Sequence, residues 1–236
     1  MAAAGFWAFV GASSLIVGAL IALTGRLKGK PLELLIGFGS GALVSALAFD
    51  LFEEAIKASA TGLSVAIGFV AGAVAYFVGS EIIDRMPGAD AKDGGGGLPI
   101  LLGAVLDGIP ESIVLGLTLV GGAPSIAVLG AIFISNVPES VTSSTGMLAG
   151  GRRPAWVIGV WTLVAIASAL SAAIGYGLLS AAPGDVIALV DAFAAGAIIT
   201  LLANDLFPAA HAENNRLVGL AVAAGFAVAA FLSFSD

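Results

Sequence analysis

Two short stretches of the chain place a proline and a carboxylate inside strongly apolar sequence. One reads LDGIPES and carries Asp107 and Glu111, and the other reads SNVPES and carries Ser135 and Glu139. In each pair the two residues are four positions apart, a spacing that puts both side chains on one face of a helix. The pattern predicts two helices that each present oxygen ligands from a single face.

The prolines predict an interruption within each of these helices. Proline has no N–H and clashes with the carbonyl four residues earlier. Pro110 would therefore release the carbonyl of Leu106, and Pro138 would release that of Ile134. A released carbonyl in an apolar environment needs a partner from the protein or from water. Asn136 lies one residue from the Ser135 face and can turn its amide oxygen toward the same centre.

The elements that position these residues follow from composition. Of the 236 residues, 59% are hydrophobic and only 11% are charged, whereas soluble domains are about one quarter charged. Apolar runs of about 20 residues follow one another, which is typical of transmembrane helices. The chain has no cysteine and a single histidine, and no basic patch with interleaved aromatics points to nucleic acid.

We therefore predict an all-α integral membrane protein with one transmembrane domain over residues 1–236, lying in a lipid bilayer. Short breaks rich in Gly, Pro, Asn or charge divide it into eight spans. The break at 88–97 is a glycine-rich linker. The predicted spans are 6–24, 34–56, 62–84, 98–120, 125–148, 154–180, 184–208 and 214–234.

The distribution of basic residues predicts the orientation. Eight of the nine lysines and arginines fall in the loops after the odd-numbered spans, and only Lys57 falls on the other side. By the positive-inside rule those loops are cytoplasmic. We expect a multi-pass protein of the plasma membrane with both termini outside.

The two Pro-Glu-Ser motifs lie deep in their spans, where a charged carboxylate is costly. Asp107 and Ser135 each lie about ten residues into a span, near the bilayer centre. A charged carboxylate there costs at least about 2.5–3.5 kcal/mol, and the spans offer no lysine or arginine at that depth. If Asp107, Glu111 and Glu139 converge, they either take up protons or bind a metal ion. Neutral acids that only join helices, or a proton relay, are the alternatives.

An internal similarity predicts an inverted 3+2+3 repeat. Residues 46–55 read ALAFDLFEEA and residues 201–210 read LLANDLFPAA. These stretches end the second and seventh spans, which run in opposite directions. Spans one to three would then mirror six to eight, and span four would mirror five. Inverted repeats place substrate sites near the midplane, on interrupted helices.

The other acids define a candidate path for a cation. Asp50, Glu53 and Glu54 lie toward the outer end of the second span. Asp205 lies near the inner end of the seventh span, with His211 just beyond it. An acidic helix end at the interface accounts equally well for Glu53 and Glu54, and an exposed loop accounts for His211.

Over essentially its whole length the chain resembles the ZIP family of divalent-metal transporters. The family's fourth helix typically carries His-Asn-x-Pro-Glu-Gly, where this chain reads Asp-Gly-Ile-Pro-Glu-Ser from Asp107. Its fifth helix carries a Pro-[Glu/His] core, to which the SNVPE stretch ending at Glu139 is similar. Its seventh helix carries Glu-x-x-Pro-x-x-His, and NDLFPAAH is similar, with Asp205 and Pro208 matching.

The resemblance implies a binuclear metal centre between helices four and five. Asp107, Glu111 and Glu139 would be metal ligands, and Asn136 would be a ligand at the second metal site. It also implies a homodimer, and transport by rocking or elevator-like motion. The metal is the substrate, with no permanently bound cofactor. The family favours zinc, whereas Asp107 in place of histidine widens the choice to manganese or iron, because all-oxygen sites suit harder ions.

We expect a transporter and not an enzyme. No GxxxxGK[ST] motif for ATP is present. Two other functions stay open at this point. One is a proton-coupled carrier of another solute, in which the carboxylates titrate without binding metal. The other is an integral-membrane, metal-dependent enzyme, for which FDLFEEA is the nearest acidic motif.

Overall fold

The computed structural model describes residues 1–86, 106, 108, 111–119 and 125–234. Regular structure within these residues is helical, with no strand, which confirms the all-α prediction. Six of the described helices are long and apolar enough to cross a membrane, as in a multi-pass membrane protein. The predicted linker at 88–97, most of the predicted span 98–120, and both Asp107 and Pro110 lie outside the described residues.

The helices of the first half of the chain are followed by a short helical segment at 111–118. In order they are α1 (Ala2–Thr24), α2 (Lys30–Ala46), η1 (Leu47–Phe52), α3 (Glu53–Ala58) and α4 (Leu63–Asp84). Those of the second half are α6 (Ile126–Ala149), α7 (Pro154–Leu179), α8 (Gly184–Leu201), η4 (Leu202–Leu206), α9 (Phe207–Ala210) and α10 (Val218–Ser233).

Local sequence accounts for several of these boundaries. α1 ends at Gly25, whose φ of 65° lets its N–H close the last turn on Ala22. Ser125 caps α6 by accepting a hydrogen bond from the N–H of Val128. α10 begins later than the predicted 214, because Asn214 has a φ of 55° and lies in a loop.

The second and seventh membrane crossings share an unusual feature. α2 continues through η1 into α3, and α8 continues through η4 into α9; η1 and η4 are both π-helical. They fall within the two similar stretches of sequence, and each holds an aspartate, Asp50 and Asp205. A π-helical turn adds a residue to the helix and is frequent at functional sites.

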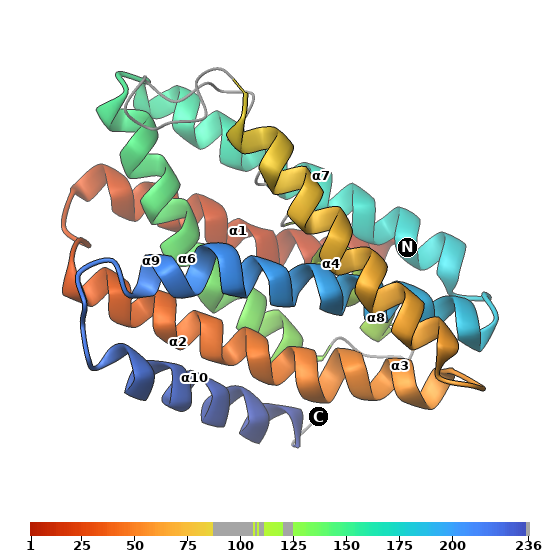
Figure 1. The fold of residues 1–236 in the computed structure, drawn as a ribbon. Coiled ribbons are helices and arrows are strands. Elements are labelled where there is room, and N and C mark those ends of the chain that lie inside the picture. The colour runs from red at the N-terminus through yellow and green to blue at the C-terminus, as the bar shows by residue number, and fades with distance from the viewer. Residues whose placement is uncertain (87–105, 107, 109–110, 120–124, 235–236) are drawn as a thin grey trace.

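The helices pack as two groups. α1 packs along α6 and α7, whereas α4 packs along α8 and α10 along α2. The main contact between the groups is made by α2 with α6. Figure 1 shows α6 crossing behind α8 and α2 at a steep angle, whereas α2 and α10 run side by side. α6, which carries the second Pro-Glu-Ser motif, is therefore the helix through which the two groups meet.

The α4–α8 pair depends on glycines that let the backbones touch. A Cβ atom at Gly72 would overlap the carbonyl oxygen of Phe193, and one at Gly196 would overlap that of Phe69. Small residues at such crossings let helices in membranes approach closely and gain van der Waals contact. These two positions must therefore remain glycine for the pair to pack as it does.

The α10–α2 pair has the same kind of contact. A Cβ atom at Gly225 would overlap the carbonyl oxygen of Phe38, and one at Gly41 would overlap that of Val222. In both pairs each helix contributes one glycine, and that glycine packs against a backbone carbonyl of the other helix. The two pairs thus meet in the same reciprocal manner.

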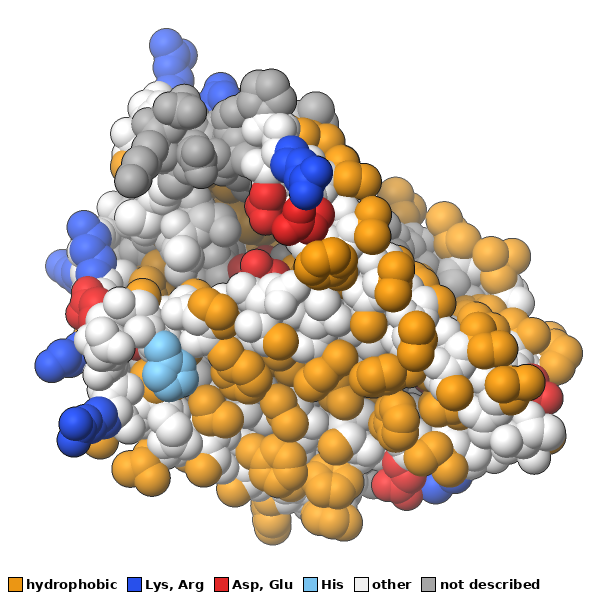
Figure 2. Space-filling model, viewed as in Figure 1, with side chains coloured by type: hydrophobic (Ala, Val, Ile, Leu, Met, Phe, Trp, Pro, Cys, Tyr) orange, Lys and Arg blue, Asp and Glu red, His pale blue; other side chains and the backbone are white. Residues whose placement is uncertain are grey.

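The ends of the bundle differ in charge. Both termini lie at one end, with the loops after α3 and α7 (Figure 1). We call this the terminal end. The loops after α1, α6 and α9 lie at the other, which we call the basic end. Figure 2 shows lysine and arginine side chains along this edge and apolar side chains over much of the remaining face. The basic end holds Arg26, Lys28, Lys30, Arg152, Arg153 and Arg216.

Candidate functional site

A small, mostly apolar cavity with three polar residues on its wall lies between α1, α6 and the helical segment at 111–118. Its volume is about 10 Å³, enough for a single water-sized group. The polar residues on its wall are Glu111, Ser112 and Asn136, and the rest of the wall is apolar: Ala8, Ala12, Leu115 and Ile132. The cavity thus joins one acid and one amide from the two Pro-Glu-Ser motifs.

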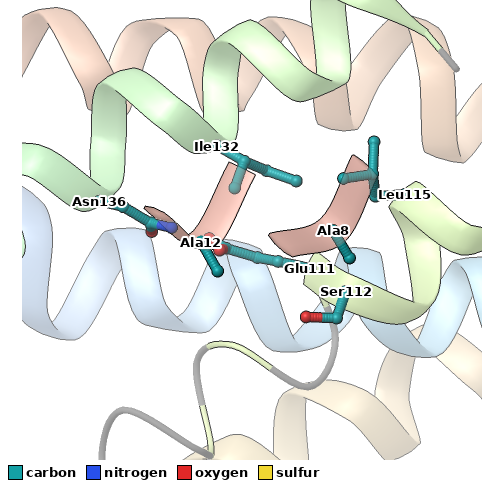
Figure 3. Close-up of a pocket in the computed structure, with 7 residues that line it drawn as sticks. All are labelled: Ala8, Ala12, Glu111, Ser112, Leu115, Ile132 and Asn136. Atoms are coloured by element: carbon teal, nitrogen blue, oxygen red, sulfur yellow. The ribbon is translucent and has the colours of Figure 1, made fainter. Parts of the chain in front are cut away.

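Glu111 and Asn136 are both withdrawn from solvent. Only 4% of Glu111 and 5% of Asn136 is exposed. Figure 3 shows the two side chains pointing toward one another from opposite walls, with Ala12 beside them. A carboxylate, a carboxamide and a serine therefore line one small space. Ser112 also donates from its hydroxyl to the carbonyl of Gly108.

Close packing supports α6 at its proline. Pro138 is buried inside the helix. A Cβ atom on Gly39 of α2 would lie 3.2 Å from the carbonyl oxygen of Ile134, the group that Pro138 leaves without its helical donor. It would lie 2.9 Å from the Cα of Ser135. Glycine at position 39 thus lets α2 approach the backbone beside Asn136.

α1 forms a wall of the cavity, which the sequence analysis missed. Ala8 and Ala12 line it, and Gly18 further along α1 packs so tightly on α6 that a Cβ there would overlap the hydroxyl of Ser140. The available signal was the spacing of small residues: Ala4, Ala8 and Ala12 recur every four residues and are all buried.

The segment that carries Glu111 is set against α7. A Cβ on Gly108 would lie 3.3 Å from the hydroxyl oxygen of Ser168, and one on Gly116 would lie 2.9 Å from the carbonyl oxygen of Ala172. Ser168 is buried. These contacts fix the segment's orientation, so that Glu111 lies on the side facing α1 and α6.

Two predicted residues of α6 do not line the cavity. Ser135 is buried, and its hydroxyl donates to the carbonyl of Ile132 at 3.1 Å within its own helix. Glu139 is half-buried and lies one turn beyond Asn136. The predicted pairing of Ser135 and Glu139 on one face therefore does not bring either of them to the cavity.

The predicted three-carboxylate cluster remains a prediction. Among the residues that the structure describes, no three histidines or acids lie close enough together to hold a metal ion. Asp107 lies outside the described residues, so its position relative to Glu111 and Glu139 is not part of this description. What the described residues bring together is Glu111 with Asn136.

Asp50, in η1, is tied to two other helices. The hydroxyl of Ser125 donates to its Oδ1 at 3.2 Å, and the hydroxyl of Ser233 donates to its Oδ2 at 2.9 Å. Ser125 precedes α6 and Ser233 ends α10. The carboxylate therefore joins three elements at the terminal end of the bundle.

Glu53 and Glu54 lie on the surface. Both are exposed, and their carboxylates pair with Lys57 at 2.9 Å and 3.3 Å. Exposed pairs of this kind within one helix contribute little to stability. The arrangement matches an acidic helix end at an interface.

Asp205 and His211 lie toward the basic end. Asp205, in η4, is exposed and accepts a hydrogen bond of 2.8 Å from the hydroxyl of Tyr76 on α4. His211 is exposed, with Nδ1 3.0 Å from the carbonyl oxygen of Phe207. The sequence analysis identified both residues but not Tyr76, whose side chain is only 4% exposed.

Two further acids tie helix starts to loops. Glu33 on α2, only 3% exposed, accepts a hydrogen bond from the N–H of Glu213. Asp185 on α8 accepts one from the N–H of Ala60 at 3.0 Å. One bond lies at the basic end and the other at the terminal end, and each joins the first turn of a helix to the loop that precedes α10 or α4.

No protein-family model matches the chain, and no curated protein is significantly similar to it in sequence. The fold nevertheless defines a broad class, that of multi-pass helical membrane proteins. Within that class, a buried carboxylate and carboxamide face each other between helices, which is the arrangement on which a functional proposal can be built.

Proposed function

We propose that the chain is a transporter of divalent metal cations, with zinc as the first candidate and manganese and iron as the others. The observation that carries this proposal is the burial of Glu111 in one small cavity with Asn136 and Ser112. Ionisable residues inside a membrane mark ion pathways, because burying them without a function is costly. Oxygen donors of this kind bind divalent ions of the first transition row.

The size of the cavity favours a cation over a larger solute. About 10 Å³ admits one water-sized group, so an ion would reach Glu111 after shedding most of its hydration shell. Carboxylate, amide and hydroxyl oxygens would take the place of those waters. The full ligand set that we propose adds Asp107 and Glu139 to Glu111 and Asn136, although Glu139 does not line the cavity in this structure.

We propose that the fold is an inverted 3+2+3 repeat of eight spans. Three observations support it. η1 and η4 are π-helical at matching points of α2 and α8. The pairs α4–α8 and α10–α2 use the same reciprocal glycine contacts. A carboxylate at the start of α2 and one at the start of α8 each accept a loop N–H. In this scheme α1 corresponds to α7.

The basic end gives the proposed transport path a direction. With the basic end in the cytoplasm, both termini face outside, the Asp50 segment lies at the outer half, and the Asp205 segment lies at the inner half. We place the protein in the plasma membrane as a homodimer. Transport would require the α1–α6–α7 group to move against the group formed by α2, α4, α8 and α10, since α6 joins them.

The test is metal flux into proteoliposomes. Glu111→Gln keeps the shape of the side chain and removes its charge, so flux of Zn²⁺, Mn²⁺ or Fe²⁺ should fall by more than the roughly 10–100-fold typical of residues that only support metal ligands. The matched control is Glu33→Gln, because Glu33 is equally buried but lies outside the cavity, and glutamine keeps an oxygen for the N–H of Glu213.

Undiminished flux in Glu111→Gln and in the double variant Glu111→Ala with Glu139→Ala would remove this site from the mechanism. A proton-coupled carrier of another solute predicts a different result. It would show no metal flux in the wild-type protein, while a proton gradient would still be dissipated when the correct solute is added.

A further inference from the structure

Asp50 is the point at which three helical elements meet at the terminal end. It lies in η1, it is half-buried, and its two carboxylate oxygens accept hydrogen bonds from Ser125 before α6 and Ser233 at the end of α10. Hydrogen bonds in which the acceptor is ionised are roughly twice as strong as neutral ones. Moving α6 away from α2 would break the bond from Ser125, whereas Ser233 on α10 lies in the same helix group as Asp50.

The bond to Ser125 reaches the helix that carries the cavity. The Ser125 oxygen accepts from the N–H of Val128 while its hydroxyl hydrogen is given to Asp50. One hydroxyl can do both, since it has one hydrogen and two lone pairs. Asp50 therefore holds α6 by its N-terminal cap, about three turns before Asn136. This connection crosses between the two helix groups.

The matching aspartate at the basic end is held differently. Asp205 is exposed, and within the described part of the chain it accepts one side-chain hydrogen bond, of 2.8 Å, from the hydroxyl of Tyr76 on α4 (Figure 1). α4 and η4 belong to the same helix group, so this bond does not connect the two groups. The terminal end is thus fastened between groups at Asp50, whereas the bond of Asp205 to Tyr76 stays within one group.

We propose that Asp50 is a latch that holds the terminal end of the path closed, and that breaking its bond to Ser125 is the step that opens this end, while the bond from Ser233, within its own helix group, keeps the carboxylate in position. The inference rests on the proposed function, because it supplies the gate that such a transporter needs. It is a conformational role: Asp50 acts through the position of α6 and does not bind the cation in the cavity.

The chain contains no cysteine, so a single introduced thiol can report on opening without background. Val128→Cys places a thiol in the first turn of α6, where the native side chain is only 1% exposed. The readout is the rate at which a membrane-impermeant maleimide labels this thiol in the full-length protein in liposomes. Thr61→Cys, in the exposed loop at the same end, gives the rate for an accessible thiol.

Ser233→Ala removes the bond that keeps the Asp50 carboxylate in position, with little effect on packing. We expect it to raise the labelling rate of the Val128→Cys thiol severalfold, and Asp50→Ala to raise it further. The matched control is Ser80→Ala, because Ser80 also lies near the end of a helix but donates to Phe77 in its own helix. Ser233→Thr retains a hydroxyl and should restore slow labelling.

The latch would be overturned if the Val128→Cys thiol were labelled at one rate in the reporter protein alone and in the reporter protein with Ser233→Ala, Ser80→Ala or Asp50→Ala added. The same proteins assayed for metal flux separate the two proposals. Faster labelling in Ser233→Ala without any metal flux in the wild type would retain the latch and reject the transported ion. Metal flux in the wild type, with no change in the labelling rate of the variants, would retain the metal transporter and reject the latch.

Discussion

The Asp50 and Asp205 segments are alike in sequence and in local structure, and they differ in what surrounds them. LAFDLF forms η1 and LANDL forms η4, both π-helical and both at the end of a long helix. Asp50 is half-buried and bonded to two serines from other elements. Asp205 is exposed and bonded to one tyrosine.

The difference shows that local sequence determines the backbone geometry of the segment, whereas tertiary packing determines the hydrogen-bond partners of its aspartate. The shared residues go with a shared backbone geometry, a helix whose turn widens around an aspartate. The task of each carboxylate depends on side chains far away in the chain: Ser125 and Ser233 for one, Tyr76 for the other. Two copies of one element can therefore be held by different partners at the two ends of the bundle.

The largest expected effect tests whether the two halves are built alike. Gly72→Ala and Gly225→Ala each place a methyl group on a backbone carbonyl oxygen. Overpacking of this kind costs about 1–3 kcal/mol, and a backbone carbonyl is harder to move than a side chain. We expect both variants to lower the thermal midpoint in detergent, and by similar amounts.

Gly219→Ala is the matched control, because this glycine of α10 has no atom within 4 Å of an added Cβ. Alanine is favoured over glycine in a helix by about 0.5–1 kcal/mol, so the midpoint should stay the same or rise. A strong loss in Gly225→Ala with none in Gly72→Ala would show that the two helix pairs are not equivalent, and would count against the repeat.

The second comparison concerns the two aspartates, and the quantity it tests is the difference in stability loss between their alanine variants. Asp50→Ala removes the acceptor for two hydroxyls at a half-buried position, and bonds to charged groups contribute about 1.5–3 kcal/mol. Asp205→Ala removes a single part-buried bond from the hydroxyl of Tyr76, so we expect it to cost less than Asp50→Ala. Unfolding of both variants by denaturing detergent, followed by helical circular dichroism, measures the difference. Equal losses would mean that the serines add nothing.

Much of the fold could be predicted because membrane helices are long and apolar. The all-helical class and the membrane-spanning lengths follow from runs such as Pro154–Leu179, and the basic end follows from the loops that hold Arg26 and Arg152. Boundaries were predicted less well where a single dihedral decides them. α10 begins at Val218, because Asn214 holds the loop with a positive φ.

The site could be predicted only in part. Proline and glutamate at fixed spacing identified Glu111, and the neighbouring asparagine identified Asn136, since polar residues are rare in such spans. The wall formed by Ala8 and Ala12 has no chemical signature, because alanine is used for close packing everywhere in the chain. The partners of Asp50 were missed for a related reason: Ser125 and Ser233 become its donors only through tertiary packing.

The prediction with the smallest expected effect tests whether the terminal end is stabilised by the hydrogen bonds of Asp50 or by surface charge. Lys57→Ala removes the pairs with Glu53 and Glu54, which lie just beyond η1 and have no counterpart beside Asp205 at the described basic end. All three side chains are exposed, so water and salt already screen their attraction. We expect no measurable change in the thermal midpoint, and none in labelling of the Val128→Cys reporter. A clear loss of stability at low salt, abolished at high salt, would instead assign the difference between the two ends to this ion pair, and the serines bound to Asp50 would then be secondary.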